Sequence, residues 1–390
     1  MKKRLSILLL CACAVIAAAG CQSNQPVSNA LSEAESSVAV SSEQPSEPVK
    51  GDTHPITDFR GNTVEVPNVI ERIVVLGPLP LPTVLAAYQE GYTGNIVGVD
   101  PDSINGAQHT IFSRYAPDFT DIASAFYNGG QLNMEELVKL EPDVVFYMGA
   151  EMAALFEQVS IPAVEFAHPS SGGDASPLLT LKSWMDTLEQ VLQKRSPAQE
   201  IIAYGQAVEA EIKARVAANP LAEPQRMLFL SNYTDTALAS MGKKSFGQYW
   251  SELVGGENLG SRPTSGQVNM EQIYEWAPEQ VFIMTFSDKT PEQIYTNTAA
   301  PGHDWSGIPA VTRKKVFKFP FGMHRWCPPT TDTPLAMWWV AKNARPELFE
   351  DIDLNEKIKA YYQQFYGMSL TDEDVEWILN PRPETKRMNM

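Results

Sequence analysis

The sequence predicts an α/β protein of two lobes, each with a central, mostly parallel sheet flanked by helices, joined by one long helix. Short runs of β-branched and aromatic residues alternate with helical segments, which is typical of parallel sheets. This alternation pauses over residues 196–218, which have a helical composition, and then resumes. The segment 133–148 recurs as 269–284 with seven of sixteen positions identical, so the second half repeats the plan of the first.

The first lobe is expected to open with a hairpin and to continue as alternating strands and helices. Turn residues from Asp58 to Asn62 lie between alternating apolar positions, a pattern that is typical of a hairpin. Continuous runs of β-branched residues then predict buried parallel strands. These strands are expected at 72–77, 95–100, 143–149 and 162–167, with helices at 81–91 and 133–141.

The second lobe is expected to follow the long helix, in which Pro197 suits the first turn. Its strands are predicted at 226–232, 280–286 and 314–320. Nothing after the first twenty residues is long and apolar enough to predict a membrane-spanning helix.

The N-terminus has the pattern of an export signal. Lys2, Lys3 and Arg4 precede an apolar run of about fifteen residues, which is short for a spanning helix. The run ends in Ala18-Ala19-Gly20-Cys21, which resembles the lipobox of bacterial lipoproteins. The resemblance implies that Cys21 is acylated and begins the mature chain; the alternative is an ordinary cleavage site with a chance cysteine. We therefore expect a lipid-anchored protein at the cell membrane, on its extracytoplasmic face.

The composition excludes several classes of partner. Residues 22–50 are rich in Ser, Glu, Pro and Gln without an aromatic residue, which is typical of a flexible tether. The net charge of −17 would become −20 on loss of the signal, and this acidity argues against binding nucleic acid or anionic lipid. Cys327 is the one cysteine after Cys21, so no intramolecular disulfide is expected in the folded body.

The chain therefore divides into five predicted parts. They are a signal peptide at 1–20, a lipidated Cys with its tether at 21–50, an N-terminal α/β lobe at 51–190, a linker helix at 191–222 and a C-terminal α/β lobe at 223–390.

Five segments, taken in their order and spacing, resemble a known family over about residues 52–365. They are 56–76, 133–146, 251–260, 265–282 and 305–320. The family comprises the substrate-binding lipoproteins of ABC importers for iron–siderophore complexes, haem and cobalamin. The resemblance implies a monomeric receptor without cofactor or catalysis, which captures a metal-containing small molecule between two lobes. The receptor would deliver this ligand to an ABC permease and its ATPase.

The repeated segment supplies one glutamate to each lobe, Glu135 and Glu271, in the motif Asn-Met-Glu. The resemblance implies that both residues dock on the permease. The alternative is local, because a carboxylate in the first turn after an Asn also stabilises the start of a helix.

The ligand is expected beyond the carboxyl ends of the strands, as in other open α/β sheets. The segment FGMHRWCPPTTD, residues 321–332, has no regular period, and its mixture of polar, aromatic and cationic groups favours a ligand-facing loop. The candidate contacts are His324, Arg325, Trp326, Tyr233, His168 and Tyr147.

Each candidate also has a structural alternative. His324 can bind a metal or a chelate, or can simply be solvated. Arg325 can pair with a ligand carboxylate or oxyanion, or can form a structural ion pair. Trp326 can stack on a flat ligand or anchor the loop in the core. Cys327 can be a soft metal ligand, although a lone cysteine is more often a small buried hydrophobe.

The resemblance favours a ferric siderophore or other chelated iron as the ligand. Cobalamin, haem, a nickel chelate and molybdate or tungstate stay open, because an oxyanion would favour Arg325 and a direct metal would favour His324. The alternatives of another class are a membrane-tethered sensor and an uncharacterised enzyme. The chain lacks the His-Glu-x-x-His, Gly-x-Ser-x-Gly and dinucleotide-binding glycine motifs.

Overall fold

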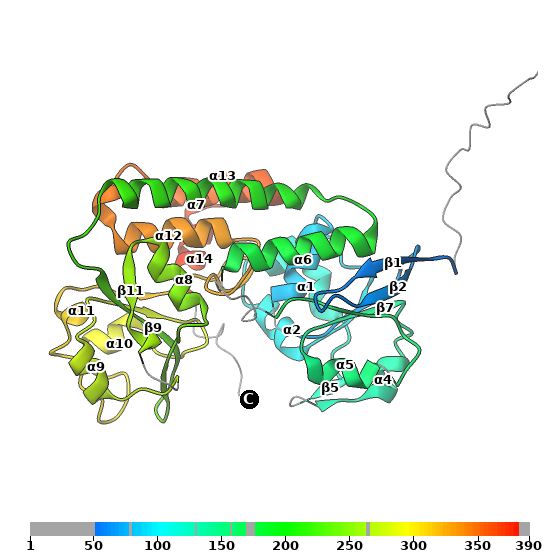
Figure 1. Ribbon diagram of the computed structural model, residues 1–390, viewed down its shortest axis with the longest axis horizontal. Helices are drawn as coiled ribbons and strands as arrows, with labels where there is room; N and C mark the ends of the chain where they lie inside the picture. Colours follow the sequence, from blue (N-terminus) through cyan, green and yellow to red (C-terminus); the bar gives the residue numbers. More distant parts are fainter. Residues whose placement is uncertain are drawn as a thin grey trace, which may run out of the picture. The chain divides into compact units, whose positions relative to one another are not determined.

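The computed structural model describes residues 51–77, 80–128, 131–156, 158–168, 176–262 and 266–381 (Figure 1). The predicted signal peptide, Cys21 and the tether lie outside the described residues. All the described residues belong to one compact unit of the chain, so the two predicted lobes are parts of a single body.

The first lobe is built on a four-stranded parallel sheet of order β4-β3-β7-β8. Its strands are β3 (Ile73–Val75), β4 (Ile96–Val99), β7 (Val144–Tyr147) and β8 (Ala163–Glu165). Its helices are α1 (Pro80–Tyr88), α2 (Pro101–Gln108), α3 (Phe112–Tyr115), α4 (Met134–Val138) and α5 (Ala150–Phe156). Because β3 and β7 are fully buried, their uninterrupted apolar sequences match a sheet that is covered on both faces.

Two small antiparallel pairs accompany this sheet. They are β1 (Thr53–Thr57) with β2 (Thr63–Pro67), and β5 (Tyr127–Asn128) with β6 (Gln131–Leu132). The turn of the first pair is fixed by Asp58, whose Oδ1 accepts hydrogen bonds from the backbone N–H groups of Arg60 (2.9 Å) and Asn62 (2.8 Å). The predicted hairpin is therefore present.

The second lobe has a five-stranded sheet of order β10-β9-β12-β13, with β11 also paired to β9. Its strands are β9 (Gln225–Tyr233), β10 (Leu238–Ser240), β11 (Gly256–Asn258), β12 (Gln280–Ile283) and β13 (Val316–Lys318). Only β10 is antiparallel to its neighbour, so the prediction of a mostly parallel sheet is confirmed for this lobe too. Its helices are α8 (Phe246–Leu253), α9 (Met270–Trp276), α10 (Pro291–Tyr295) and α11 (Pro309–Thr312).

Five further helices accompany the two sheets, and all of them except α14 are longer than the helices named above. They are α6 (Pro177–Leu192), α7 (Glu200–Ala218), α12 (Thr333–Ala344), α13 (Leu354–Tyr366) and α14 (Asp372–Leu379). Helix α7 connects the two sheets along the chain, and the proline expected in its first turn begins the short 3₁₀ turn Pro197–Gln199 that leads into it. No helix in the described ranges has both the length and the apolar character to cross a membrane.

The C-terminal helices contact more than the second lobe. The ring of Tyr366 on α13 lies edge-on to Tyr115 of α3, with centroids 5.3 Å apart. Asp374 on α14 forms an ion pair with Arg114 of α3. Residues 354–379 thus pack against the first lobe, although the sequence assigned them wholly to the second, because their aromatic partners are too distant in sequence to be recognised.

Candidate functional site

The segment 321–332 follows β13 at the carboxyl edge of the second sheet and has no helix or strand, as predicted. It is held as a tight loop by two backbone bonds, from Gly322 N–H to His324 C=O (3.1 Å) and from Trp326 N–H to Pro320 C=O (3.2 Å). All twelve residues are buried. A loop rich in polar groups is expensive to bury, so its buried polar atoms require partners from the protein or from a ligand.

The guanidinium group of Arg325 lies between two aromatic rings. The Arg325 side chain is only 2% exposed, and its Cζ lies 4.6 Å from the ring centroid of Phe286 and 4.7 Å from that of Phe321. Helix α2 of the first lobe approaches the same group, since a Cβ added to Gly106 would lie 3.8 Å from Arg325 Nη1. The rings restrain the guanidinium plane, and a desolvated cation held in one plane is suited to binding an anion.

His324 lies beside Arg325 in an equally buried position. The imidazole is 3% exposed, and neither ring nitrogen has a hydrogen-bond partner among the described residues. Burial lowers the pKa of His324 well below its usual value, and the neighbouring positive charge of Arg325 lowers it further. At neutral pH the ring is therefore uncharged, with one N–H to donate and one nitrogen to accept.

This burial predicts a specific pH dependence of stability. Below about pH 6.5 the unfolded chain takes up a proton on His324 that the folded protein excludes, so the free energy of unfolding falls as the pH falls. The slope from one such group is at most about 1.4 kcal/mol per pH unit. Urea unfolding at pH 7.5 and 5.0 measures the effect. In His324→Gln the free energy of unfolding should fall less between these two pH values than it does in the wild type. His109→Gln, at an exposed histidine, is the control; equal slopes in the wild type and His324→Gln would contradict the prediction.

A buried carboxylate, Asp332, fixes the shape of the loop. Its Oδ2 accepts hydrogen bonds from the Met323 N–H (2.7 Å), the Trp326 Nε1–H (3.0 Å) and the Tyr362 hydroxyl (2.9 Å), and its Oδ1 accepts one from the Tyr366 hydroxyl (2.8 Å). Burial raises the pKa of Asp332, while these four donors oppose the rise. We call these five residues the Asp332 network; it ties the loop to α13.

Trp326 and Cys327 lie in the core. Trp326 is fully buried with its indole N–H bonded to Asp332, which is the position of a loop anchor. Cys327 is also fully buried, its Sγ lies 4.0 Å from Met241 Sδ, and burial raises the pKa of its thiol. A buried, protonated thiol behaves as a small hydrophobe.

Tyr233, at the end of β9, points into a cluster of the second lobe. Its hydroxyl accepts a hydrogen bond from Trp305 Nε1 (2.8 Å) and lies 3.1 Å from Nδ1 of His303. The Tyr233 and His303 rings are stacked, with centroids 5.6 Å apart. The hydroxyl therefore has two partners within its own lobe, and a ligand role for Tyr233 stays a prediction.

The two candidates of the first lobe lie at or just after the carboxyl ends of the neighbouring strands β7 and β8. Tyr147 ends β7 and lines a hollow of about 520 Å³ together with Arg60 and Asp58 of the hairpin. Burial and the nearby Glu165 raise the pKa of Tyr147 to about 12. His168 follows β8 on the surface, and partial burial lowers its pKa. The structure thus places His324, Arg325 and Trp326 on one buried loop, while Tyr147 and His168 belong to the first lobe and Tyr233 to the cluster with His303 and Trp305.

Glu135 and Glu271 are exposed at the starts of their helices. Asn133 caps α4, its Oδ1 accepting from the N–H groups of Glu135 (3.1 Å) and Glu136 (3.2 Å). Asn269 caps α9 in a reciprocal pair with Gln272, each backbone N–H donating to the other side chain at 2.9 Å. In both helices the Asn does the capping, so neither glutamate is needed for it.

Sequence reasoning missed Asp332, Phe321 and Gly106 as individual site residues. Asp332 lies between Thr331 and Thr333, so the residues around it gave no signal that its carboxylate is buried. Its hydrogen-bond donors lie up to 34 residues away in the sequence, so the residues near Asp332 do not reveal them. Within the described ranges, no three His, Cys, Asp or Glu side chains gather in a way that could hold a metal ion.

The comparisons with known proteins agree with this architecture. The family model described as periplasmic binding protein matches residues 85–321. The chain belongs to the periplasmic binding protein family. The family relationship inferred from the sequence is therefore confirmed, and the relatives are solute-binding proteins of transport and not enzymes.

Two members of the family extend the match to most of the chain. The molybdate-binding protein MolA of Haemophilus influenzae is 27% identical over 336 residues, which cover 80% of this chain and 91% of that protein. The structure of MolA with molybdate bound has a TM-score of 0.67 to this chain, at 26% identity, covering 82% of this chain and 99% of that one.

A periplasmic solute-binding protein of Veillonella parvula has a TM-score of 0.72 at 30% identity, covering 84% of this chain and 97% of that one. CeuE of Helicobacter pylori, solved with nickel, has a TM-score of 0.63 at 20% identity and covers 84% of this chain and 99% of that one. At this identity the likeness to CeuE shows the fold alone.

Proposed function

We propose that this periplasmic binding protein is the lipid-anchored receptor of an ABC importer. Cleavage before Cys21 would leave an acylated N-terminus, and residues 22–50 would tether the folded body to the extracytoplasmic face of the membrane. The lipobox-like sequence Ala18-Ala19-Gly20-Cys21 supports the anchor, and the family supports the transport role. The receptor acts as a monomer and releases its solute unchanged to the permease.

The solute is held against the loop 321–332, with Arg325 and His324 as the contacts. The observation that carries this assignment is the pair of adjacent side chains, each at least 97% buried, one a restrained cation and the other a neutral imidazole whose nitrogens have no hydrogen-bond partner among the described residues. A buried imidazole of this kind is retained where a ligand completes its hydrogen bonds.

A small tetrahedral oxyanion of the molybdate or tungstate class is the solute that these two residues support best. A guanidinium offers parallel N–H donors that match two oxygen atoms of an anion, and a neutral imidazole adds one more donor. Desolvation strengthens each of these bonds. The relative that is named for molybdate supports the same class.

The second candidate is a ferric siderophore or another form of chelated iron. The sequence favoured this solute. The observation in its favour is the neutral imidazole of His324, whose nitrogens can bind either a metal or the polar edge of a chelate. Cobalamin, haem and a nickel chelate are metal-containing alternatives of the same kind, and the titration described next includes them. Tyr233, His168, Tyr147 and Trp326 stay predictions as ligand contacts.

Calorimetric titration of residues 51–390, stripped of solute, tests this assignment. The panel consists of molybdate, tungstate, sulfate, ferric siderophores, haem, cobalamin and nickel chelates. We expect saturable binding of molybdate or tungstate. Saturable binding of a ferric chelate alone would support the second candidate instead. If no compound of the panel binds, both candidates are rejected.

We further propose that Glu135 and Glu271 dock the loaded receptor on the permease. Both carboxylates are exposed, lie at equivalent places in the two lobes and are not used as caps. Two such anchors would chiefly fix orientation, since single surface ion pairs are weak.

The double variant Glu135→Arg/Glu271→Arg should abolish uptake in cells while leaving solute affinity within about twofold, because both residues are exposed and remote from the loop 321–332 in sequence. Glu223→Arg/Glu350→Arg, at two other exposed glutamates, is the matched control and should transport normally. Weakened solute binding in the first variant, or normal uptake by it, would contradict the docking role.

A further inference from the structure

Two of the exposed apolar side chains occupy equivalent positions of the repeated segment. Val138 is 45% exposed and Tyr274 is 42% exposed, and each comes three residues after the glutamate of its helix, in NMEELV and NMEQIY. Large hydrophobic side chains this exposed are few in the described residues: Phe59, Tyr92, Val138, Leu155, Leu179, Leu221 and Tyr274. A single exposed hydrophobe needs no explanation, but recurrence at matched positions does.

The local geometry places each apolar residue beside its glutamate. Residues three apart lie on the same face of a helix, so Val138 neighbours Glu135 and Tyr274 neighbours Glu271. The residue before each of them, Leu137 or Ile273, is fully buried and anchors the helix to its lobe. The exposure therefore belongs to the outward face of an anchored helix and not to a frayed end.

Tyr274 is also held in position. A Cβ added to Gly307 would lie 3.1 Å from Tyr274 Cε1, so the ring lies along the backbone at that glycine. The Ser306 backbone and hydroxyl chiefly lower the pKa of the nearby Asp304 carboxyl, and the Tyr274 side chain contributes to the same shift. A ring fixed before association loses little conformational freedom when a partner covers it.

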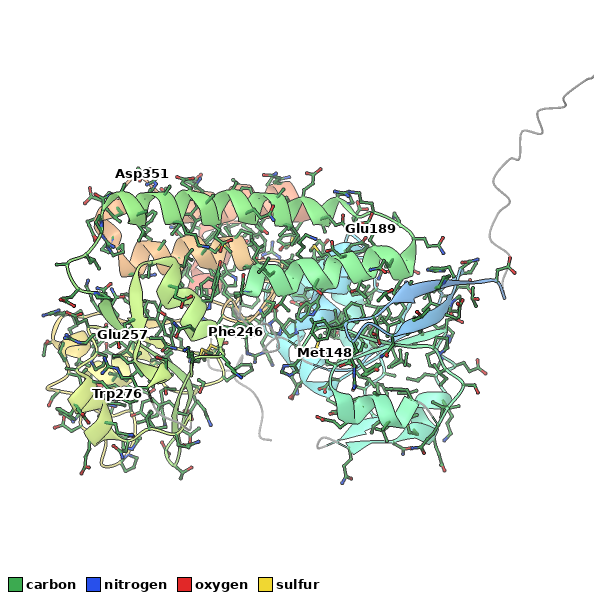
Figure 2. The ribbon with its side chains drawn as sticks, in the orientation of Figure 1. Met148, Glu189, Phe246, Glu257, Trp276 and Asp351 are labelled. Atoms are coloured by element: carbon green, nitrogen blue, oxygen red, sulfur yellow. The ribbon has the colours of Figure 1, made fainter. Side chains whose placement is uncertain are left out.

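The charge of both helices indicates a basic partner. On α9, Glu271 and Glu275 are both exposed and the helix has no basic residue. On α4, Glu136 is paired with Lys139 (2.5 Å between Oε1 and Nζ), and among the described residues Glu135 has no ion-pair partner. Figure 1 shows α4 and α9 at the edges of their lobes opposite α7, and Figure 2 labels Trp276, the last residue of α9.

We propose that Val138 and Tyr274 are the apolar halves of two matched docking faces, Glu135 with Val138 and Glu271 with Tyr274. The partner is the membrane permease, which presents a basic side chain beside an apolar depression at two equivalent places. Covering the apolar residue excludes water from the neighbouring ion pair and so strengthens it. This inference rests on the proposed function and adds the residues that make the weak surface ion pairs effective.

The test measures affinity of the full, lipidated receptor for its host's permease–ATPase complex in nanodiscs. Val138→Ser/Tyr274→Ser should weaken binding at least about tenfold, as burial of two such side chains predicts, and Tyr274→Phe should bind like the wild type. Leu179→Ser, at a 57% exposed residue of α6, is the control and should change affinity less than about twofold. Glu135→Gln/Glu271→Gln reports separately on the docking role itself.

The outcomes separate the two ideas. If the glutamate variant loses binding and the serine variant does not, the inference is overturned and the docking role stands. If neither variant loses binding, the docking role fails together with the inference. If Leu179→Ser weakens binding as much as the serine double variant, the effect is unspecific and the inference is also overturned.

Discussion

Gly322→Ala should destabilise the protein by about 3 kcal/mol and abolish solute binding. A Cβ at this position would overlap Asp332 Oδ2 and the Tyr362 hydroxyl oxygen and would lie 2.9 Å from Trp326 Nε1. All three atoms are buried and belong to the Asp332 network, so none can move without breaking a hydrogen bond. The loop that carries His324 and Arg325 would therefore lose both its packing and its anchor.

Urea unfolding and calorimetric titration with molybdate check this expectation. Gly242→Ala is the matched control, because a Cβ there would meet only Gly260 C=O at an ordinary 3.9 Å. The control should unfold within about 1 kcal/mol of the wild type. A Gly322→Ala protein that unfolds like this control would show that the network is loose, which contradicts the packing described above.

Arg325→Gln should weaken binding of an oxyanion by about a hundredfold or more, since losing one buried charged partner commonly costs about 2–5 kcal/mol. The guanidinium supplies the positive charge beside the neutral His324, and the rings of Phe286 and Phe321 hold it in one plane. Arg325→Lys keeps the positive charge but loses the planar guanidinium, so its affinity for the oxyanion should lie between those of the wild type and Arg325→Gln.

Titration of the three proteins at pH 7.5 with molybdate or tungstate measures this series. Thermal unfolding of each variant serves as the control, because loss of the stacked guanidinium also removes packing. Equal affinity in the wild type and in folded Arg325→Gln would remove Arg325 from the site. Equal affinity in the wild type and Arg325→Lys would show that only charge matters there.

Most of the fold could be predicted because its signals are local. The strands at Ile73–Val75 and Val144–Tyr147 follow from continuous β-branched and aromatic runs, and Asn133 and Asn269 mark the starts of α4 and α9. The irregular loop was predicted for the same reason, since no period runs through residues 321–332.

The functions of single residues were harder to predict because they depend on contacts that are distant in sequence. The sequence left Trp326 either as a stacking ring or as a loop anchor; its buried bond to Asp332, whose other donors come from Met323 and α13, supports the anchor, and a ligand contact stays a prediction. The ring that approaches Arg325 from outside the loop is Phe286, 39 residues earlier in the sequence. Sequence located the loop correctly but could not orient its side chains.

The contacts of α13 and α14 with α3 have a consequence for how the chain must be made. The surface of α3 around Arg114 and Tyr115 is completed by Asp374 and Tyr366, some 250 residues later. A chain still emerging from the ribosome or a secretion pore cannot finish its N-terminal half until almost its last residue is available. Loss of a short stretch at the C-terminus would thus leave part of the N-terminal lobe without its packing partners.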